Sequence, residues 1–235
     1  MKVLDCRDPA TWGPSIDEAV HAVARGELVV LPTDTVYGIG CDAFSPEAVA
    51  RLLAAKGRGR QMPPPVLVGS KGTLDGLASD VPPQVRLLVE RFWPGALTII
   101  CRAQPSLAWD LGETRGTVAL RMPDDECALA LLRRTGPMAV SSANTTGRPA
   151  ALDAADAREQ LGAAVSLYLD GGPAAGAVAS TIVDATGDVL RVVRSGALGL
   201  DELRAVSPGV RGPQPPVQQP EPPAPAAQQG DGAPA

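Results

Sequence analysis

The chain has 235 residues, of which 45% are hydrophobic and only 3% aromatic, and its formal net charge is −5. This length allows one substantial domain or at most two small ones, with a core built mainly from Ala, Val and Leu. No apolar run approaches the roughly 20 residues that span a bilayer, and Asp5 and Asp8 interrupt the N-terminus where a secretory peptide needs its apolar stretch. We therefore expect a cytoplasmic protein without membrane segments.

Helices and strands interleave along residues 1–206. The first helix is predicted to begin at Ser15, with Glu18 closing a capping box, and to end at Gly26. His21 falls on its polar face, which predicts a solvent-exposed position. Further helices are predicted over 46–56, 84–92, 126–134 and 155–162, and strands over 27–32, 65–68, 96–101, 117–121, 137–140, 166–170, 180–184 and 189–193.

This order of elements predicts a mixed α/β (α+β) sheet with helices on its faces, forming one domain over residues 1–206. The last two strands are separated only by ATGD, which indicates a hairpin. Residues 207–235 are rich in Pro, Gln and Ala and are predicted to form a disordered tail. The four cysteines form no CxxC pair, so we expect reduced, isolated thiols and neither a zinc site nor disulfides.

The run PTDTVYGIG at residues 32–40 follows the first predicted buried strand directly. Loops at strand ends are where α/β sheets bind ligands. Thr33 and Thr35 offer hydroxyl groups, and Gly38 and Gly40 permit close approach of the backbone. The run is a candidate binding loop, and an ordinary strand–turn–strand connection is the alternative.

Residues 48–74 contain five basic side chains and no acidic one, although the whole chain is acidic. Lys56, Arg58 and Arg60 are separated by glycines, which let backbone amides approach an anion. Arginine adds a planar fork suited to phosphate or carboxylate. The block lacks the spacing of a P-loop, and a solvent-exposed basic loop is the alternative interpretation.

Other polar candidates lie next to predicted strands. The run VSSANTTGRP places small hydroxyls and an amide after the strand at 137–140, and no histidine is near enough in sequence to activate its serines as nucleophiles. Acid–base chemistry at neutral pH usually enlists histidine, and His21 is the only one. Besides Thr33 and Thr35, the candidates outside the basic block are Arg121, Ser141, Ser142, Asn144, Ser180, Thr181 and Arg194.

A site made of Lys, Arg, Ser, Thr and Asn side chains suits binding of a polyanion and stabilisation of charge that develops in a transition state. Phosphoryl or nucleotidyl transfer needs mainly such positioning and screening, usually with Mg²⁺. These residue types therefore predict a nucleoside triphosphate as the ligand.

Five motifs, in order over roughly residues 15–200, resemble the YrdC/Sua5 family of threonylcarbamoyl-AMP synthases. They are PTDTVYGIG, Lys56-x-Arg58, Ser142-x-Asn144, LRMP at 120–123, and STIVD at 180–184 together with Arg194. The resemblance implies a YrdC-like twisted mixed β-sheet around a large basic cavity. It also implies a nucleotidyltransferase that makes threonylcarbamoyl-AMP and pyrophosphate from L-threonine, bicarbonate and ATP. The product would pass to a transfer machinery for tRNA t⁶A modification. Mg²⁺ is expected with ATP, and its ligands are not assigned.

The resemblance also implies roles for individual residues. The catalytic residues would be Lys56 and Arg58. The nucleotide and its phosphates would be held by Lys56, Arg58, Ser142, Asn144 and Arg194. L-Threonine would be held by Thr35, Arg121, Ser142 and Ser180, with Arg121 paired with its carboxylate.

The chain departs from the family pattern in three places. GRGRQMPPPVLVG is longer than the usual connection after Lys-x-Arg and lacks histidine, so Arg60 joins the candidates without a role. PAAL at 149–152 stands where the family commonly has Ser-Pro-Thr. The Pro/Gln-rich tail stands where longer members carry a second domain, so the chain resembles the short form.

Two other functions stay open. The block at 48–74 predicts, as one alternative, a double-stranded RNA-binding module, because cationic patches bind phosphate backbones. The acidic body and the few aromatic residues argue against it. The other alternative is a related carbamoyl-adenylate step on a different substrate, which only the pocket of Thr35, Arg121 and Ser180 could distinguish.

Overall fold

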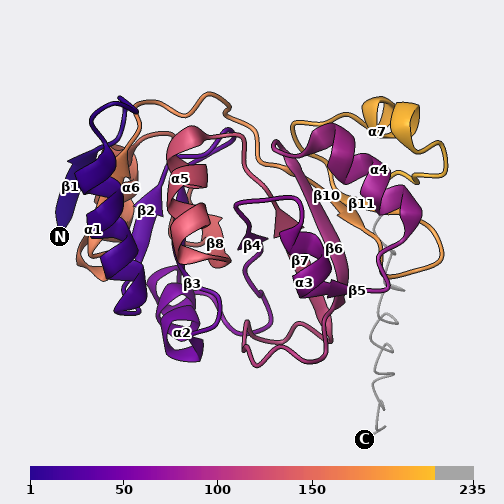
Figure 1. The fold of residues 1–235 in the computed structure, drawn as a ribbon, viewed down its shortest axis with the longest axis horizontal. Coiled ribbons are helices and arrows are strands. Elements are labelled where there is room, and N and C mark those ends of the chain that lie inside the picture. The colour runs from indigo at the N-terminus through magenta and orange to yellow at the C-terminus, as the bar shows by residue number, and fades with distance from the viewer. Residues whose placement is uncertain (215–235) are drawn as a thin grey trace, which may run out of the picture.

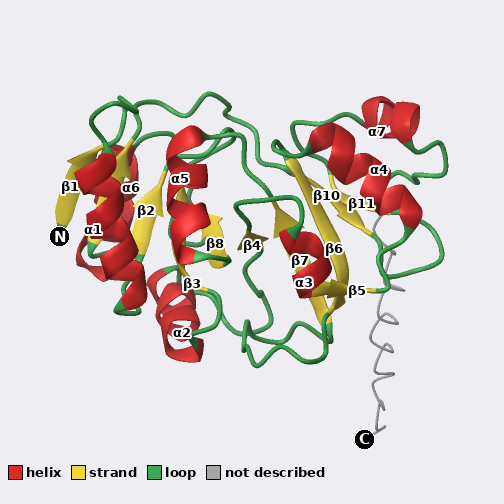
Figure 2. Cartoon of the chain, in the orientation of Figure 1, coloured by secondary structure: helices red, strands yellow, loops and turns green. Residues whose placement is uncertain are grey.

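The structure, a computed structural model, describes residues 1–214 and consists of one twisted sheet with helices packed against it (Figures 1 and 2). The strand order is β1-β9-β2-β3-β8-β4-β7-β6-β10-β11, with β5 paired to β6. Strand β2 is parallel to β9 and antiparallel to β3, and both kinds of pairing recur across the sheet. The predicted mixed α/β fold is confirmed.

The strands lie close to their predicted positions wherever one was predicted. They are β1 Lys2–Asp5, β2 Val29–Leu31, β3 Gly38–Asp42, β4 Val66–Leu67, β5 Ala78–Ser79, β6 Leu97–Ala103, β7 Thr117–Arg121, β8 Met138–Ser142, β9 Leu167–Asp170, β10 Thr181–Asp184 and β11 Arg191–Arg194. Strands β10 and β11 pair antiparallel, as the ATGD signal indicates. Sequence patterns missed β1, β3 and β5.

The helices are α1 Gly13–Ala24, α2 Pro46–Ala55, α3 Thr73–Leu77, α4 Pro83–Phe92, α5 Glu126–Thr135, α6 Ala154–Leu161 and α7 Leu200–Val206, with a 3₁₀ turn at Gly162–Ala164. Helices α3 and α7 were not predicted; each is no longer than seven residues. No helix among residues 1–214 is long and apolar enough to cross a membrane.

The predicted start of the first helix is wrong. Helix α1 begins at Gly13, and its N-cap, Trp12, makes no side-chain hydrogen bond. The Ser15 hydroxyl instead donates to the backbone oxygen of Asp5, at 2.8 Å. The Ser15/Glu18 pattern therefore ties the helix to the end of β1 through Ser15 and does not cap it. His21 is exposed, as predicted.

One half of the sheet, here called the covered half, contains β1, β9, β2, β3 and β8. Val29 and Leu31 of β2 pack in one hydrophobic cluster with α1 and α5, whereas Leu28 and Val30 belong to a second cluster with α2 and α6. Successive side chains of a strand point to opposite faces of its sheet. The central strands of the covered half are therefore buried on both faces.

The other half, here called the cavity half, contains β4, β7, β6, β10, β11 and β5. Leu97 and Ile99 of β6 are buried in one cluster with residues of α3 and α4, but Thr98 and Ile100 line a cavity on the opposite face. In Figure 1 the orange connection after β9 crosses from the covered half to β10 in the cavity half. The cavity lies where the two halves meet.

The packed part of the chain continues past residue 206, where the tail was predicted to begin. Ser207 and Val210 are buried, and Arg211 forms a β-bridge with Arg191 at the edge of β11. The predicted boundary therefore falls inside the packed region. The rest of the predicted tail, residues 215–235, lies outside the described residues.

Candidate active site

A cavity of about 380 Å³ is lined by residues from both halves of the sheet. Such a volume is typical of small-molecule sites. The covered half contributes the loop after β2 and the end of β8, and the cavity half contributes β4, β6, β7, β10 and β11. The polar lining includes Thr33, Thr35, Arg58, Thr98, Thr117, Arg121, Ser141, Ser142, Ser180 and Arg194.

Alternation along the strands explains how these side chains reach the cavity. On β7, Thr117, Ala119 and Arg121 line the cavity, while Leu120 is fully buried in the hydrophobic cluster behind the sheet. On β10, Ile182 lines the cavity and Val183 is buried behind it. A period of two thus presents polar side chains on one face without weakening the apolar packing of the other.

The charged residues of the cavity lining, within the described part of the chain, are Arg58, Arg121 and Arg194. No Asp, Glu or His joins them there. Burial, followed by the nearby charges of Arg121 and Arg58, lowers the pKa of Arg194. Asp34 compensates the charge of Arg121, so the charges of Arg58 and Arg194 are the ones that favour an anion in this cavity.

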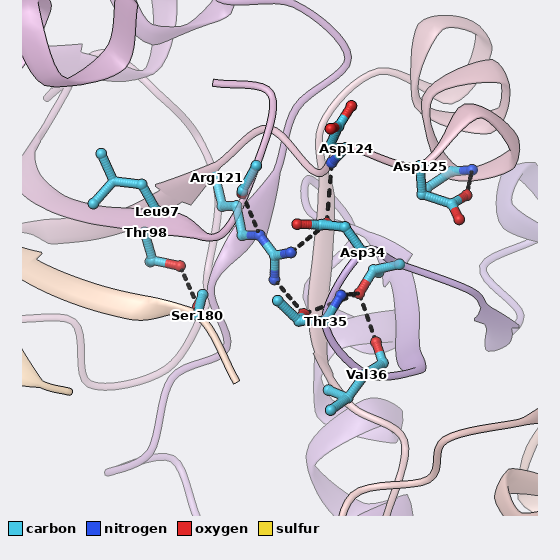
Figure 3. Close-up of polar contacts among 12 residues, drawn as sticks. Asp34, Thr35, Val36, Leu97, Thr98, Arg121, Asp124, Asp125 and Ser180 are labelled. Atoms are coloured by element: carbon cyan, nitrogen blue, oxygen red, sulfur yellow. Dashed lines mark hydrogen bonds and ion pairs between the residues drawn. The ribbon is translucent and has the colours of Figure 1, made fainter. Parts of the chain in front are cut away.

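Arg121 is buried, with 7% of its surface exposed, and its side chain donates to three groups in two separate segments. Its Nε donates to the Gly95 oxygen at 3.0 Å, Nη1 donates to Thr35 Oγ1 at 2.9 Å, and Nη2 donates to Asp34 Oδ1 (Figure 3). Burial lowers the pKa of Arg121 and the charge of Asp34 opposes that shift. The guanidinium group is therefore held in one orientation by a buried ion pair.

The two threonines of PTDT form a directed chain with Arg121. The Thr33 hydroxyl donates to the Val36 oxygen at 2.6 Å and lies 3.1 Å from Thr35 Oγ1. Because a hydroxyl has only one proton, the Thr35 hydroxyl must donate to Thr33 while accepting from Arg121. Figure 3 shows Arg121, Thr35 and Val36 of this chain beside Asp34, whose Oδ1 also accepts from the Asp124 amide at 3.0 Å.

Ser180 and Arg194, which were predicted for different ligands, touch each other. Arg194 Nη2 donates to Ser180 Oγ at 2.9 Å and to the Ser180 oxygen at 2.8 Å. Ser180 Oγ also lies 2.8 Å from Thr98 Oγ1 (Figure 3). The structure therefore joins the predicted threonine pocket and the predicted nucleotide pocket into one continuous surface.

Arg58 reaches the cavity from the basic loop. Its Nη1 donates to Ser141 Oγ at 3.1 Å, whereas its Nε is buried and has no hydrogen-bond partner among the described residues. Burial lowers the pKa of Arg58. A buried donor without an acceptor is costly, so this nitrogen is a candidate to bind a ligand oxygen.

Lys56 and Asn144 are also brought together, but neither lines the cavity. Lys56 is fully buried, and its Nζ donates to the Ser142 oxygen, to the Asn144 oxygen at 2.6 Å and to Asn144 Oδ1 at 3.1 Å. Burial and the nearby charge of Arg58 lower the pKa of Lys56 to about 7. Ser142, whose backbone oxygen accepts from Lys56, does line the cavity.

The remaining cations of the 48–74 block do not form a free basic patch. Arg60 pairs with Asp110 at 2.8 Å, Lys71 pairs with Glu90 at 3.1 Å, and Arg51 donates to the Gly26 oxygen at 2.8 Å. An RNA-binding module needs a contiguous basic surface. These three side chains do not form one, because each is bound to a different partner.

Sequence patterns missed Thr98 and Thr117 as cavity residues, and they missed Asp34. Each threonine is a polar side chain next to buried apolar residues in its strand. That interruption of an apolar run was the signal in the sequence. Asp34 lies between the two threonines of the candidate loop. Among residues 1–214, no group of three or more His, Cys, Asp or Glu side chains is arranged to hold a metal ion.

Two relatives share most of this chain. A Mycobacterium tuberculosis protein, named provisionally as a threonylcarbamoyl-AMP synthase, is 53% identical over 205 residues, which are 87% of this chain and 94% of the relative. The Bacillus subtilis threonylcarbamoyl-AMP synthase is 36% identical over 84% of this chain and 58% of its own length.

Two solved structures share the fold. Pyrococcus abyssi Sua5 in complex with L-threonine has a TM-score of 0.86 at 32% identity, covering 90% of this chain and 62% of its own. Escherichia coli YciO has a TM-score of 0.75 at 25% identity, covering 86% of this chain and 97% of its own.

The Sua5/YciO/YrdC family model, described as "telomere recombination", matches residues 21–196. This match spans most of the folded region and all five motifs that the sequence shares with the family. The chain therefore belongs to the Sua5/YciO/YrdC family.

Proposed function

We propose that this protein is an L-threonylcarbamoyl-AMP synthase, a nucleotidyltransferase that uses L-threonine, bicarbonate and ATP. The observation that carries the proposal is the convergence of Arg58, Arg121 and Arg194 with small hydroxyls in one cavity. The names of the relatives support the same product, and the L-threonine bound to the Sua5 neighbour supports that substrate. The product would then be transferred to tRNA by other proteins.

The reaction needs no covalent enzyme intermediate. Bicarbonate takes up a proton and gives CO₂ and water. The threonine ammonium group loses one proton to solvent, and the neutral amine adds to CO₂ and releases a second proton to give a carbamate. A carbamate oxygen then attacks the α-phosphorus of ATP, and the bond from that phosphorus to the bridging oxygen of pyrophosphate breaks. Negative charge grows on the leaving pyrophosphate, and fixed guanidinium groups stabilise such charge.

We assign the amino acid to the side of the cavity around Arg121. There Thr35 holds Arg121, which uses three of its five N–H donors inside the protein and keeps the others for a ligand. Ser180 also lines the cavity, and Arg121 would bind the threonine carboxylate. The nucleotide is assigned to Arg58, Ser142 and Arg194, which lie along the same lining. Ser142 remains a candidate for both substrates.

Mg²⁺ is expected to accompany ATP, where it would neutralise charge on the phosphate oxygens. Mg²⁺ commonly keeps several waters and binds through substrate phosphates with few protein carboxylates. The arginine-rich lining fits a metal carried in this way, by the triphosphate, and no side chain is assigned as its ligand.

The test is a reconstitution with L-threonine, bicarbonate and ATP. We expect pyrophosphate release that depends on all three substrates, and threonylcarbamoyl-AMP detected by mass spectrometry. Pyrophosphate release that is unaffected when threonine is omitted would contradict the proposal. Tight, strongly salt-dependent binding of double-stranded RNA without adenylate formation would favour the RNA-binding alternative.

A further inference from the structure

Two residues of the predicted nucleotide set are buried behind the cavity wall. Lys56 is 0% exposed and Asn144 is 7% exposed, and neither belongs to the cavity lining. Their sequence neighbours Arg58 and Ser142 do line it. Motif residues that are close together in sequence are thus divided between the cavity surface and the layer beneath it.

The donors of Lys56 are fully used inside the protein. An ammonium group has three N–H donors, and Nζ has three acceptors: the Ser142 oxygen, the Asn144 oxygen and Asn144 Oδ1. The backbone adds a fourth tie, because the Thr146 amide donates to the Lys56 oxygen at 3.0 Å. Contact with a phosphate would require some of these bonds to break.

The side chain of Asn144 is engaged in the same way. Its Oδ1 accepts from Lys56, and its Nδ2 donates to the Thr145 oxygen at 3.0 Å and to the Arg148 oxygen at 2.7 Å. Both N–H donors of the amide are therefore used on the backbone of its own loop. No donor of Asn144 is left for a nucleotide.

We infer that Lys56 and Asn144 form a buried clamp that shapes residues 142–148, and that they act on the nucleotide only by positioning Arg58, Ser141 and Ser142. The clamp joins the end of α2 to the end of β8, so it sets the distance between Arg58 and its partner Ser141. The inference assigns a role within the proposed function. It rests on that function only where ATP is used as a probe.

Lysine acylation tests this on the unmodified protein, because the chain has only three lysines: Lys2, Lys56 and Lys71. Because burial lowers the pKa of Lys56 to about 7, a larger share of this amine is in the reactive neutral form near neutral pH than in an ordinary lysine. Lys56 would therefore react rapidly with an acylating reagent if the reagent could reach it. We expect Lys2 and Lys71 to be labelled in the folded protein and Lys56 only in denaturant, with the sites read by peptide mass spectrometry.

Rapid labelling of Lys56 in the folded protein would overturn the inference, and protection of that labelling by ATP would identify Lys56 as a direct contact. The labelling pattern of the free protein needs neither ATP binding nor turnover. A failure of the proposed function would therefore leave this test intact, and the two failures can be told apart.

A double-mutant cycle supplies the second test. Lys56→Met and Asn144→Ala should each weaken equilibrium ATP binding by about tenfold, and the double variant by about the same factor, because either change opens the clamp. Multiplication of the two losses, to about a hundredfold, would indicate independent contacts and overturn the inference. Lys71→Met, which removes a lysine of the same basic block outside the cavity, should leave ATP binding unchanged.

Discussion

The covered half and the cavity half of the sheet use strands of different design. Residues 138–141 of β8 and 167–169 of β9 are all buried, and helices pack on both faces of β2. In β6 and β7, one face is packed and the other presents Thr98, Ala119 and Arg121 to the cavity. The covered half therefore contributes mainly to stability and gives the site only the loop after β2 and the end of β8, whereas the cavity half presents the open face of its strands to the site.

Ion pairs differ between the halves in the same way. The Arg134–Asp17 pair of the covered half joins two helices at the surface, whereas the Arg121–Asp34 pair of the site is almost fully buried. Exposed pairs contribute little to stability, but breaking a buried pair leaves an uncompensated charge. Substitutions in the two halves should thus have separable effects on folding and on activity.

The largest effect is expected for Arg121→Met. Removing the guanidinium leaves the largely buried Asp34 without its ion-pair partner and removes the proposed carboxylate contact. We expect a loss of ~3 kcal/mol or more in the free energy of unfolding and a roughly 10²–10³-fold fall in kcat/KM for threonine. Urea unfolding and pyrophosphate release measure the two effects. Arg134→Met is the matched control, with little change expected in either quantity, and near-normal turnover of the Arg121 variant would refute the assignment.

The next effect lies in the covered half. Leu31 is fully buried beside α1 and α5, so Leu31→Ala should lower the free energy of unfolding by about 2–5 kcal/mol through lost packing and a residual cavity. At a temperature where the variant is folded, kcat/KM should stay within about twofold, because Leu31 does not line the cavity. A large loss of turnover in the folded variant would show that the halves are not separable.

Arg58→Ala should give the opposite result. Arg58 lines the cavity and makes one side-chain hydrogen bond, to Ser141. We expect kcat/KM to fall by about a hundredfold, from loss of charge stabilisation, with the free energy of unfolding changed by less than about 1 kcal/mol. Arg51→Ala is the control from the same basic block. A stability loss without a loss of turnover would place Arg58 among the structural residues.

Substitutions of two alanines, one in each half, compare the halves directly, with smaller expected effects. Ala139→Leu, in fully buried β8, should lower the free energy of unfolding by about 1–3 kcal/mol through overpacking. Ala119→Leu, on the cavity face of β7, should leave stability nearly unchanged and weaken substrate binding by occupying cavity space. Calorimetric titration with ATP and thermal unfolding distinguish the two. Equal destabilisation of both variants would mean that the cavity face is as tightly packed as the covered half.

The smallest effect is expected at the exposed Arg60–Asp110 pair. The hydrogen bond from Arg60 lowers the pKa of Asp110, so the pair contributes stability that is present at neutral pH and lost as the pH falls below about 4. Arg60→Ala should keep turnover within about twofold, and its stability should converge with that of the wild type in acid. Unfolding measured from pH 7 to pH 3 checks the trend. A difference that grows in acid would contradict it.

Local sequence pattern was sufficient to predict most helices and strands, but it missed several of the short ones. Continuous apolar runs marked β2 and β9, and capping residues with an apolar stripe marked α2. Strand β3 was missed because its sequence, GIGCD, has two glycines and no alternation; it forms because it pairs with β2 and β8. The Ser15/Glu18 pattern misplaced the start of α1 because the Ser15 hydroxyl is used by the distant oxygen of Asp5.

The candidate site was predictable as a set of residues and not as an arrangement. Thr35, Arg58, Arg121, Ser142, Ser180 and Arg194 were all expected to bind ligands, and all of them line the cavity. Thr98 and Asp34 were not expected, because their partners, Ser180 and Arg121, lie more than 80 residues away in sequence. Hydrogen bonds over such separations leave no local pattern.

The sequence by itself determined the alternation of strands and helices, the concentration of cations and small hydroxyls, and the family. Tertiary structure alone decided which of those cations face the cavity. Lys56 and Arg58 are two residues apart, yet one is sealed beneath the loop at 142–146 and the other points into the cavity. The physical reason is that the direction of a charged side chain depends on which carbonyl groups and which open space surround it, and folding brings both from distant parts of the chain.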